Sequence, residues 1–173
     1  MTVIAGVAHN GKVYMASDRG MSDKGFIGSI LTPKIRKVGP LLIGYSGSQG
    51  AGQLTHYVNY PEPKYDNLEA WMRIEFCEAI QKASDLFKID INTEENGADL
   101  LVGVGGHLYE VTTEDWSVSE YTYIATGSGY AYAIGSLYTT QDWENPRERV
   151  REAVRAAIRH SPSCAGPVDL LIL

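Results

Sequence analysis

The apolar residues of this chain occur in short runs, and pairs of these runs are separated by two-residue turns. The clearest pair, TVIAGVAH and KVYMASD, flanks Asn10-Gly11, and Asn-Gly is the dipeptide that most favours a β-hairpin. Gly39-Pro40 and Gly105-Gly106 separate two further pairs, and one more strand is expected before Gly127. The pattern predicts three hairpins and a closing strand, over residues 2–18, 34–46, 98–113 and 168–173.

Helical periodicity occurs between these predicted strands. In the longest such segment, Asp66 and Glu69 are spaced as in a capping box. Another segment begins with Asn145, a favoured N-cap residue, followed by Pro146 at the first helical position. Four helices are predicted, near residues 49–58, over 66–89, directly after 127–129 and over 145–160.

The combination of elements indicates the fold class. Hairpins make the sheets antiparallel, and most predicted strands are continuous apolar runs, which are typical of sheets covered on both faces. Amphipathic helices provide that cover. We therefore expect an α+β layered sandwich, formed as a single domain over residues 1–173.

Composition and charge narrow the functional classes. The net charge of −6, with acids and bases interspersed, argues against a nucleic-acid binder and against an anionic-membrane surface. The only cysteines are Cys77 and Cys164, and the four histidines share no metal-ligand spacing, so we expect neither a metal nor a cofactor. No signal peptide and no membrane-spanning run is visible. We expect a cytoplasmic protein.

Four segments, taken in order and with their spacing, resemble proteasome β subunits and the bacterial peptidase HslV. The resemblance extends over essentially the whole chain. It implies the four-layer αββα fold of the N-terminal nucleophile hydrolases and assembly into a ring. The segments are TVIAGVAHNGKVYMASDRG (2–20), TPKIRKV (32–38), IGYSGSQG (43–50) and ATGSG (125–129).

The resemblance implies that Thr2 is a nucleophile once Met1 has been removed. A hydroxyl needs a base to take its proton, and a free α-amine, with an ordinary pKa of roughly 7.7–8.0, can be that base. An acylated amine cannot accept the proton, so this chemistry requires the removal of Met1. The structural alternative is an ordinary threonine at the start of a β-strand.

Lys34 and Asp18 match the active-site lysine of these proteins and the carboxylate that orients it. An ammonium group beside Thr2 would favour loss of a proton from its amine and its hydroxyl. The alternatives are a surface lysine, a role that Arg36 or Lys37 would fit equally, and an aspartate that forms a turn. Strand alternation places Lys37 on the opposite face from Lys34 and Arg36 on the same face, so Lys34 and Lys37 are not interchangeable.

Gly47 matches the glycine whose backbone N–H stabilises the oxyanion, and Ser128 matches the serine that binds the terminal amine. A glycine lets the substrate backbone approach closely, and an oriented N–H contributes about 10²–10³ in rate. The alternatives are an ordinary turn at Gly47 and a helix N-cap at Ser128.

Two further comparisons concern the last strand and the substrate. Many proteasome β subunits carry an Asp and a Ser just before that strand. The register here places Ser161 and Cys164 at those positions, so the carboxylate is missing, as it is in HslV.

The resemblance implies a substrate pocket near four residues, and its tyrosine favours small or apolar side chains before the cut. These residues are Met21, Thr32, Tyr45 and Gln49.

The predicted function is a threonine-type endopeptidase of a self-compartmentalising, proteasome-like ring. Peptides or unfolded proteins would be its substrates, the ring would be a homo-oligomer, and the resemblance implies an ATP-dependent unfoldase as partner. Two alternatives stay open. One is a non-catalytic ring or assembly protein that retains Met1, and the other is a small-molecule amidase on the same fold.

Overall fold

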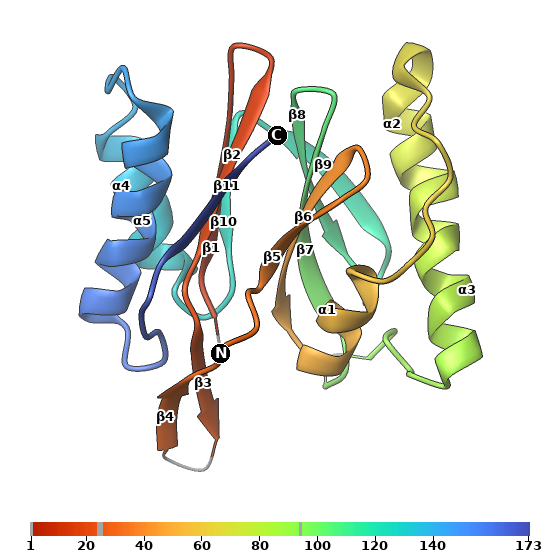
Figure 1. Cartoon of the computed structure of the whole chain (residues 1–173), viewed down its shortest axis with the longest axis horizontal. Coiled ribbons are helices and arrows are strands. Elements are labelled where there is room, and N and C mark those ends of the chain that lie inside the picture. The colour runs from red at the N-terminus through yellow and green to blue at the C-terminus, as the bar shows by residue number, and fades with distance from the viewer. Residues whose placement is uncertain (1, 24–25, 94) are drawn as a thin grey trace.

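The computed structural model of the chain describes residues 2–23, 26–93 and 95–173. Figure 1 shows two β-sheets packed face to face, each covered on its outer side by helices. Three groups of buried apolar residues fill the three spaces between these four layers. The antiparallel α+β sandwich predicted from the sequence is confirmed.

The first sheet has four antiparallel strands, and β1 lies at its centre, paired with β10 on one side and β2 on the other. The β1–β2 hairpin turns at Asn10 and Gly11, which both have positive φ, as this turn requires. In spatial order the strands are β10 (Tyr123–Thr126), β1 (Ile4–His9), β2 (Lys12–Ser17) and β11 (Asp169–Ile172).

The second sheet has five strands, and each pairs antiparallel with the next strand in the chain. Its last strand was not predicted, because Val118 is the one buried residue of that strand and no apolar run marks it. The strands are β5 (Ile35–Val38), β6 (Leu41–Gly47), β7 (Ala98–Val104), β8 (His107–Thr112) and β9 (Ser117–Tyr121).

A small separate hairpin was also missed. It consists of β3 (Gly20–Asp23) and β4 (Phe26–Ser29), and Figure 1 shows it extending beyond the two main sheets. Because β4 is largely exposed, with Phe26 63% accessible, it needs no continuous apolar run, and none marks it in the sequence.

Two helices cover the first sheet: α4 (Tyr130–Thr139) and α5 (Pro146–His160). The predicted cap of α5 is confirmed, because the side chain of Asn145 accepts a hydrogen bond from the backbone N–H of Arg147 at 3.1 Å. The buried stripe of α5, which includes Val150, packs with residues of β1 and β2 in one apolar cluster.

A longer helical segment covers the second sheet. The predicted capping box at Asp66 is wrong: the chain enters through a 3-10 turn, and Asn67 is the N-cap of the first α-helical turn. Among the described helices, none is long and apolar enough to cross a lipid bilayer. The elements on this side are α1 (Gln49–Thr55), η1 (Tyr65–Asn67), α2 (Leu68–Trp71), the π-helical η2 (Met72–Phe76) and α3 (Cys77–Phe87).

Glycines set how closely the two sheets approach each other. A Cβ on Gly6 of the first sheet would lie 3.0 Å from the side chain of Leu108 in the second. A Cβ on Gly103 of the second sheet would lie 2.9 Å from the side chain of Val13 in the first. Both distances are shorter than an ordinary van der Waals contact. Each glycine therefore makes room for a large side chain of the opposite sheet.

Candidate active site

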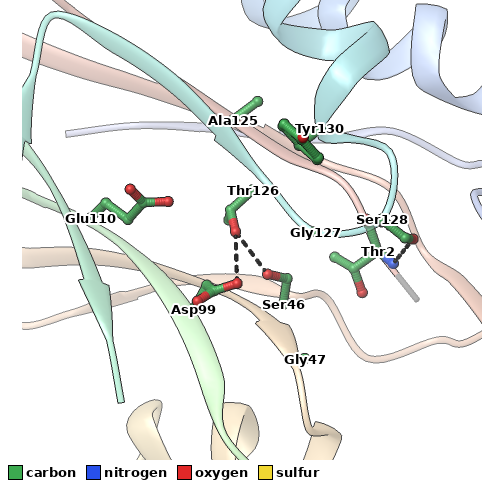
Figure 2. A pocket seen from close by; sticks show the side chains of 10 residues that line it. All are labelled: Thr2, Ser46, Gly47, Asp99, Glu110, Ala125, Thr126, Gly127, Ser128 and Tyr130. Atoms are coloured by element: carbon green, nitrogen blue, oxygen red, sulfur yellow. Dashed lines mark hydrogen bonds between the residues drawn. The ribbon is translucent and has the colours of Figure 1, made fainter. Parts of the chain in front are cut away.

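Thr2 leads into β1 and is almost fully buried, at 4% accessible. Two turns flank it: β6 ends at Gly47, and β10 is followed by Gly127 and Ser128 before α4 begins. Figure 2 shows the Thr2 side chain lying between Gly47 and Ser128. Strand ends from both sheets therefore meet at Thr2.

Asp18 and Lys34 form a buried ion pair, with Nζ of Lys34 at 2.8 Å from Oδ1 of Asp18. The Asp18 carboxylate also accepts backbone N–H groups from Val3 at 3.1 Å, Gly20 at 2.9 Å and Ala165 at 3.1 Å. Lys34 donates a second hydrogen bond to the carbonyl oxygen of Gly20. Such contacts offset the cost of removing both charges from water.

The other two basic residues of this segment lie elsewhere. Lys34 is 3% accessible, whereas Arg36 and Lys37 are exposed, and the Arg36 guanidinium lies over the ring of Tyr57. Lys34 precedes the first residue of β5, so the alternation along the strand does not govern its direction. The expectation that Lys34 and Lys37 are not interchangeable is confirmed, but the shared face expected for Lys34 and Arg36 is wrong.

Ser128 binds Thr2 and does not cap α4. Its Oγ accepts the backbone N–H of Thr2 at 3.2 Å, and the N-cap of α4 is Gly129. The N–H of Gly129 in turn donates to the carbonyl oxygen of Thr2 at 3.2 Å. The helix-cap interpretation of Ser128 is therefore wrong.

Two more serines continue from Ser128. Oγ of Ser128 lies 2.8 Å from Oγ of Ser163, which lies 2.8 Å from Oγ of Ser161. The sequence register pointed to Ser161 and Cys164 in this segment, and the contact of Ser163 with Ser128 was not predicted. The Cys164 thiol is buried, and this burial raises its pKa, which keeps it in the unreactive thiol form.

Gly47 has a backbone conformation that favours glycine. Its φ is +89°, and a Cβ there would lie 2.6 Å from the carbonyl oxygen of Gly97. Directly after it, the side chain of Ser48 accepts the N–H of Ala51 and caps α1. The sharp turn lets the chain pass from the end of β6 into α1 beside Thr2.

Two pockets share Thr2 and Gly47. The smaller, of about 30 Å³, has three of the four predicted substrate residues in its wall, namely Met21, Tyr45 and Gln49. Its remaining lining residues are Gly20, Ile30 and Lys34.

Thr32, the fourth predicted substrate residue, does not line this smaller pocket. It lines a separate pocket of about 290 Å³ with Arg36, His56 and Tyr57. The chain bends at residues 31–32, which separates Thr32 from the wall that Ile30 helps to form.

The larger pocket, of about 560 Å³, contains two acidic residues that the sequence reasoning missed. Oγ1 of Thr126 donates to Oδ2 of Asp99 at 3.2 Å and lies 3.1 Å from Oγ of Ser46 (Figure 2). Glu110 is half-buried, and this burial together with the nearby charge of Asp99 raises its pKa. A carboxylate inside an otherwise apolar strand run, as in ADLLVGV and HLYEVTT, was the signal available in the sequence.

His56 packs behind the smaller pocket. Its ring lies edge-on to Tyr45, with ring centroids 5.3 Å apart, and its Nε2 lies 3.2 Å from the carbonyl oxygen of Ile43. Burial lowers the pKa of His56 to about 4.

In the described part of the chain, no group of three or more His, Cys, Asp or Glu side chains is placed to hold a metal ion.

Comparisons with known proteins give matches at the level of structure. No protein-family model and no curated protein matches the sequence. A Thiobacillus denitrificans protein, BPH in complex with epoxomicin, has a TM-score of 0.81 at 20% identity, covering 99% of this chain and 98% of that one. A second structure of BPH from the same organism has a TM-score of 0.78 at 20% identity, covering 99% of this chain and 97% of that one.

A third neighbour is eukaryotic HslV from Trypanosoma brucei, with a TM-score of 0.71 at 20% identity, covering 99% of both chains. These neighbours are HslV-type proteins of the proteasome family. The resemblance recognised in the sequence is thus confirmed for the fold, and the chain has the four-layer αββα fold of the HslV-type N-terminal nucleophile hydrolases.

Proposed function

We propose that this chain is a threonine-type endopeptidase of a proteasome-like ring, with Thr2 as its nucleophile after removal of Met1. Met1 itself lies outside the described residues. The observation that carries the proposal is the surroundings of Thr2. Ser128 binds its backbone nitrogen, and Thr2 shares a pocket with Lys34, whose charge is paired with buried Asp18.

The reaction assigns one role to each residue. The free amine of Thr2 takes the proton from Oγ1 as this oxygen bonds to the substrate carbonyl carbon. The Lys34 ammonium favours the negative charge that develops near Thr2, and Asp18 fixes the direction of Lys34. The N–H of Gly47 donates to the carbonyl oxygen as it becomes an oxyanion.

The amine then returns the proton to the leaving nitrogen as the C–N bond breaks. The first product departs as an amine, and an ester links the second product to Thr2. Water attacks this ester, its proton passes through the same amine to Oγ1, and the acid product leaves. Ser128 holds the amine in position through both steps.

The smaller pocket supports a preference for small side chains before the cut. Its volume of about 30 Å³ is of the order of one or two water molecules. Tyr45 is 2% accessible, and its ring packs directly against Gly52, where a Cβ would clash with it. The backbone of α1 therefore keeps the ring from moving away from the pocket. We therefore assign Met21, Tyr45 and Gln49 to this pocket, with Ile30 in place of Thr32.

Ring assembly and partners belong to the same proposal. The likeness to HslV supports a homo-oligomeric ring that admits peptides or unfolded proteins, with an ATP-dependent unfoldase as partner. Mass measurement by light scattering after gel filtration tests this part. A monomer at micromolar concentration would contradict the ring.

The test of catalysis is the intact mass of the protein after incubation with epoxomicin, a peptide epoxyketone. This reactive group requires both the hydroxyl and the free amine of an N-terminal threonine. We expect a mass that lacks Met1 and carries one adduct, and we expect Thr2→Ala to abolish the adduct. Thr139→Ala, at an exposed threonine of α4, is the matched control and should react as the parent does.

Two outcomes would favour the alternatives. A protein from which Met1 has been removed and which still forms no adduct would be a non-catalytic ring protein. A protein that forms the adduct but hydrolyses small amides and not peptides would be an amidase.

A further inference from the structure

The larger pocket beside Thr2 lies on the side of the leaving group. This placement of the pocket rests on the proposed function. The Thr2 amine delivers the proton to the leaving nitrogen, and Ser128 binds the nitrogen of that amine at 3.2 Å. Ser128 lines the larger pocket and not the smaller one. The residue that follows the cleaved bond therefore faces the larger pocket.

The charge of this pocket has one sign. Its ten lining residues include two carboxylates, Asp99 and Glu110, and no lysine, arginine or histidine. In the view of Figure 2, Thr126 and Asp99 lie between Glu110 and Thr2. The hydrogen bond from Thr126 holds one oxygen of Asp99, which fixes that carboxylate in the pocket wall. A positive group here would be attracted to both acids.

The shape of the pocket suits a long side chain with a charged end. A volume of about 560 Å³ lies within the range of roughly 300–1,000 Å³ that is usual for ligand sites. Ala125 and the ring of Tyr130 supply apolar wall, against which the methylene groups of lysine or arginine can pack. The terminal charge can then lie beside the two acids.

We propose that this pocket binds the residue directly after the cut, and that Asp99 and Glu110 select lysine or arginine at that position. The state of Glu110 agrees with this, because burial and the nearby Asp99 disfavour its ionised form, and a bound cation favours that form. The smaller pocket then fixes a small residue before the cut, so the preferred bond joins a small residue to a basic one.

The test uses three peptides that differ only in the residue after the cut. Alanine precedes the cut, and lysine, norleucine or glutamate follows it, because norleucine keeps the four-carbon side chain of lysine without its terminal charged amine. For the parent protein we expect kcat/KM to be about 10-fold higher for lysine than for norleucine, and lowest for glutamate. A lysine-to-norleucine ratio of one or below in the parent protein would overturn the proposal.

Two variants assign the preference to the acids. In Asp99→Asn/Glu110→Gln the lysine-to-norleucine ratio should fall to about one, whatever the absolute rates. Glu110→Gln alone keeps the Thr126–Asp99 hydrogen bond and should leave a ratio of about 3. Glu62→Gln, at an exposed loop position, is the control and should keep the full ratio. An unchanged ratio in the double variant would contradict the assignment.

The epoxomicin adduct separates this proposal from the proposed function. A peptide epoxyketone ends at its reactive group, so it fills only the side before the cut. If the parent protein has lost Met1 and still forms no adduct, the proposed function fails. If the adduct forms and the lysine preference is absent, only the assignment of the larger pocket fails.

Discussion

Asp18 and Lys34 connect the two sheets through one buried ion pair, with Nζ and Oδ1 at 2.8 Å. Asp18 directly follows β2 of the first sheet, and Lys34 directly precedes β5 of the second. The pair therefore fixes the relative position of the two strand ends that border Thr2. The same contact that serves the proposed chemistry also contributes to holding the layers together.

Asp18→Asn should destabilise the protein strongly. The substitution leaves the Lys34 charge without its carboxylate and places an amide NH₂ where backbone N–H groups point. Removing one partner of a buried ion pair costs about 3–5 kcal/mol, and about 2–4 °C of Tm accompany each kcal/mol in a chain of this size. Thermal unfolding by circular dichroism should show a loss of roughly 6–20 °C.

Lys34→Met should cost less, because three backbone N–H groups still hold the Asp18 carboxylate. Arg73→Met is the control, since its ion pair with Glu69 is exposed and such pairs contribute about 0–1 kcal/mol. An Asp18→Asn variant as stable as Arg73→Met would contradict the ion-pair argument.

Gly47→Ala should lower both stability and reactivity. A non-glycine residue at positive φ costs about 1–2 kcal/mol, and the added Cβ would also meet the carbonyl oxygen of Gly97. Urea unfolding measures the first effect, and the rate of epoxomicin adduct formation measures the second. Gly50→Ala is the matched control: a Cβ there meets nothing within 4 Å, and alanine favours its helix by up to about 1 kcal/mol. Equal stability of the two variants would contradict the strain at Gly47.

His56 should make the protein acid-sensitive. Its pKa is about 4 in the folded state, against 6.5 when exposed. Between these values the unfolded chain binds a proton that the folded chain does not, so stability falls as the pH falls from 6.5 to 4. The loss from this one residue is at most roughly 3 kcal/mol.

Urea unfolding at pH 7.5 and pH 4.5 measures this effect. The stability of His56→Gln should depend less on pH, so its deficit relative to the parent protein should shrink at pH 4.5. His160→Gln, at an exposed position, should leave the pH dependence unchanged. A constant deficit for His56→Gln would show that protonation of His56 is not the cause.

Removing the hydroxyl of Ser128 should slow epoxomicin adduct formation more than removing that of Ser163. Ser128→Ala removes the acceptor for the Thr2 nitrogen, and one hydrogen bond contributes about 0.5–1.5 kcal/mol, so adduct formation should slow by roughly 3–10-fold. Ser163→Ala leaves Ser128 in place without its neighbour and should slow it less. Ser119→Ala, exposed on β9, should have no effect. A Ser163→Ala rate equal to that of Ser119→Ala would show that Ser163 does not position Ser128.

Much of the fold could be predicted because local sequence signals specify it. Asn10-Gly11 requires a tight turn, and Asn145 with Pro146 marks the start of α5. The missed elements lack such signals: β9 has one buried residue, and β4 is largely exposed. A capping pattern such as Asp66 to Glu69 can be present without being used, because Asp66 itself lies within a 3-10 turn.

The site was predicted less completely, because its contacts join distant parts of the chain. Asp18 and Lys34 were found through their place in a family pattern. Ser163 contacts a residue 35 positions away, and no local spacing indicates that contact. Asp99 and Glu110 lie on neighbouring strands, where the sequence gives the strands but not which face borders the pocket.

The glycines between the sheets have a consequence for the reaction itself. Thr2 leads into the first sheet and Gly47 ends a strand of the second, so the distance from nucleophile to oxyanion donor follows the thickness of the layer between them. Leu108 against Gly6 and Val13 against Gly103 set that thickness. A shift of about 1 Å in reacting groups can cost about 10²-fold in rate. A single methyl group added deep inside the protein, at Gly103, would thus slow the reaction without contacting any atom that takes part in it.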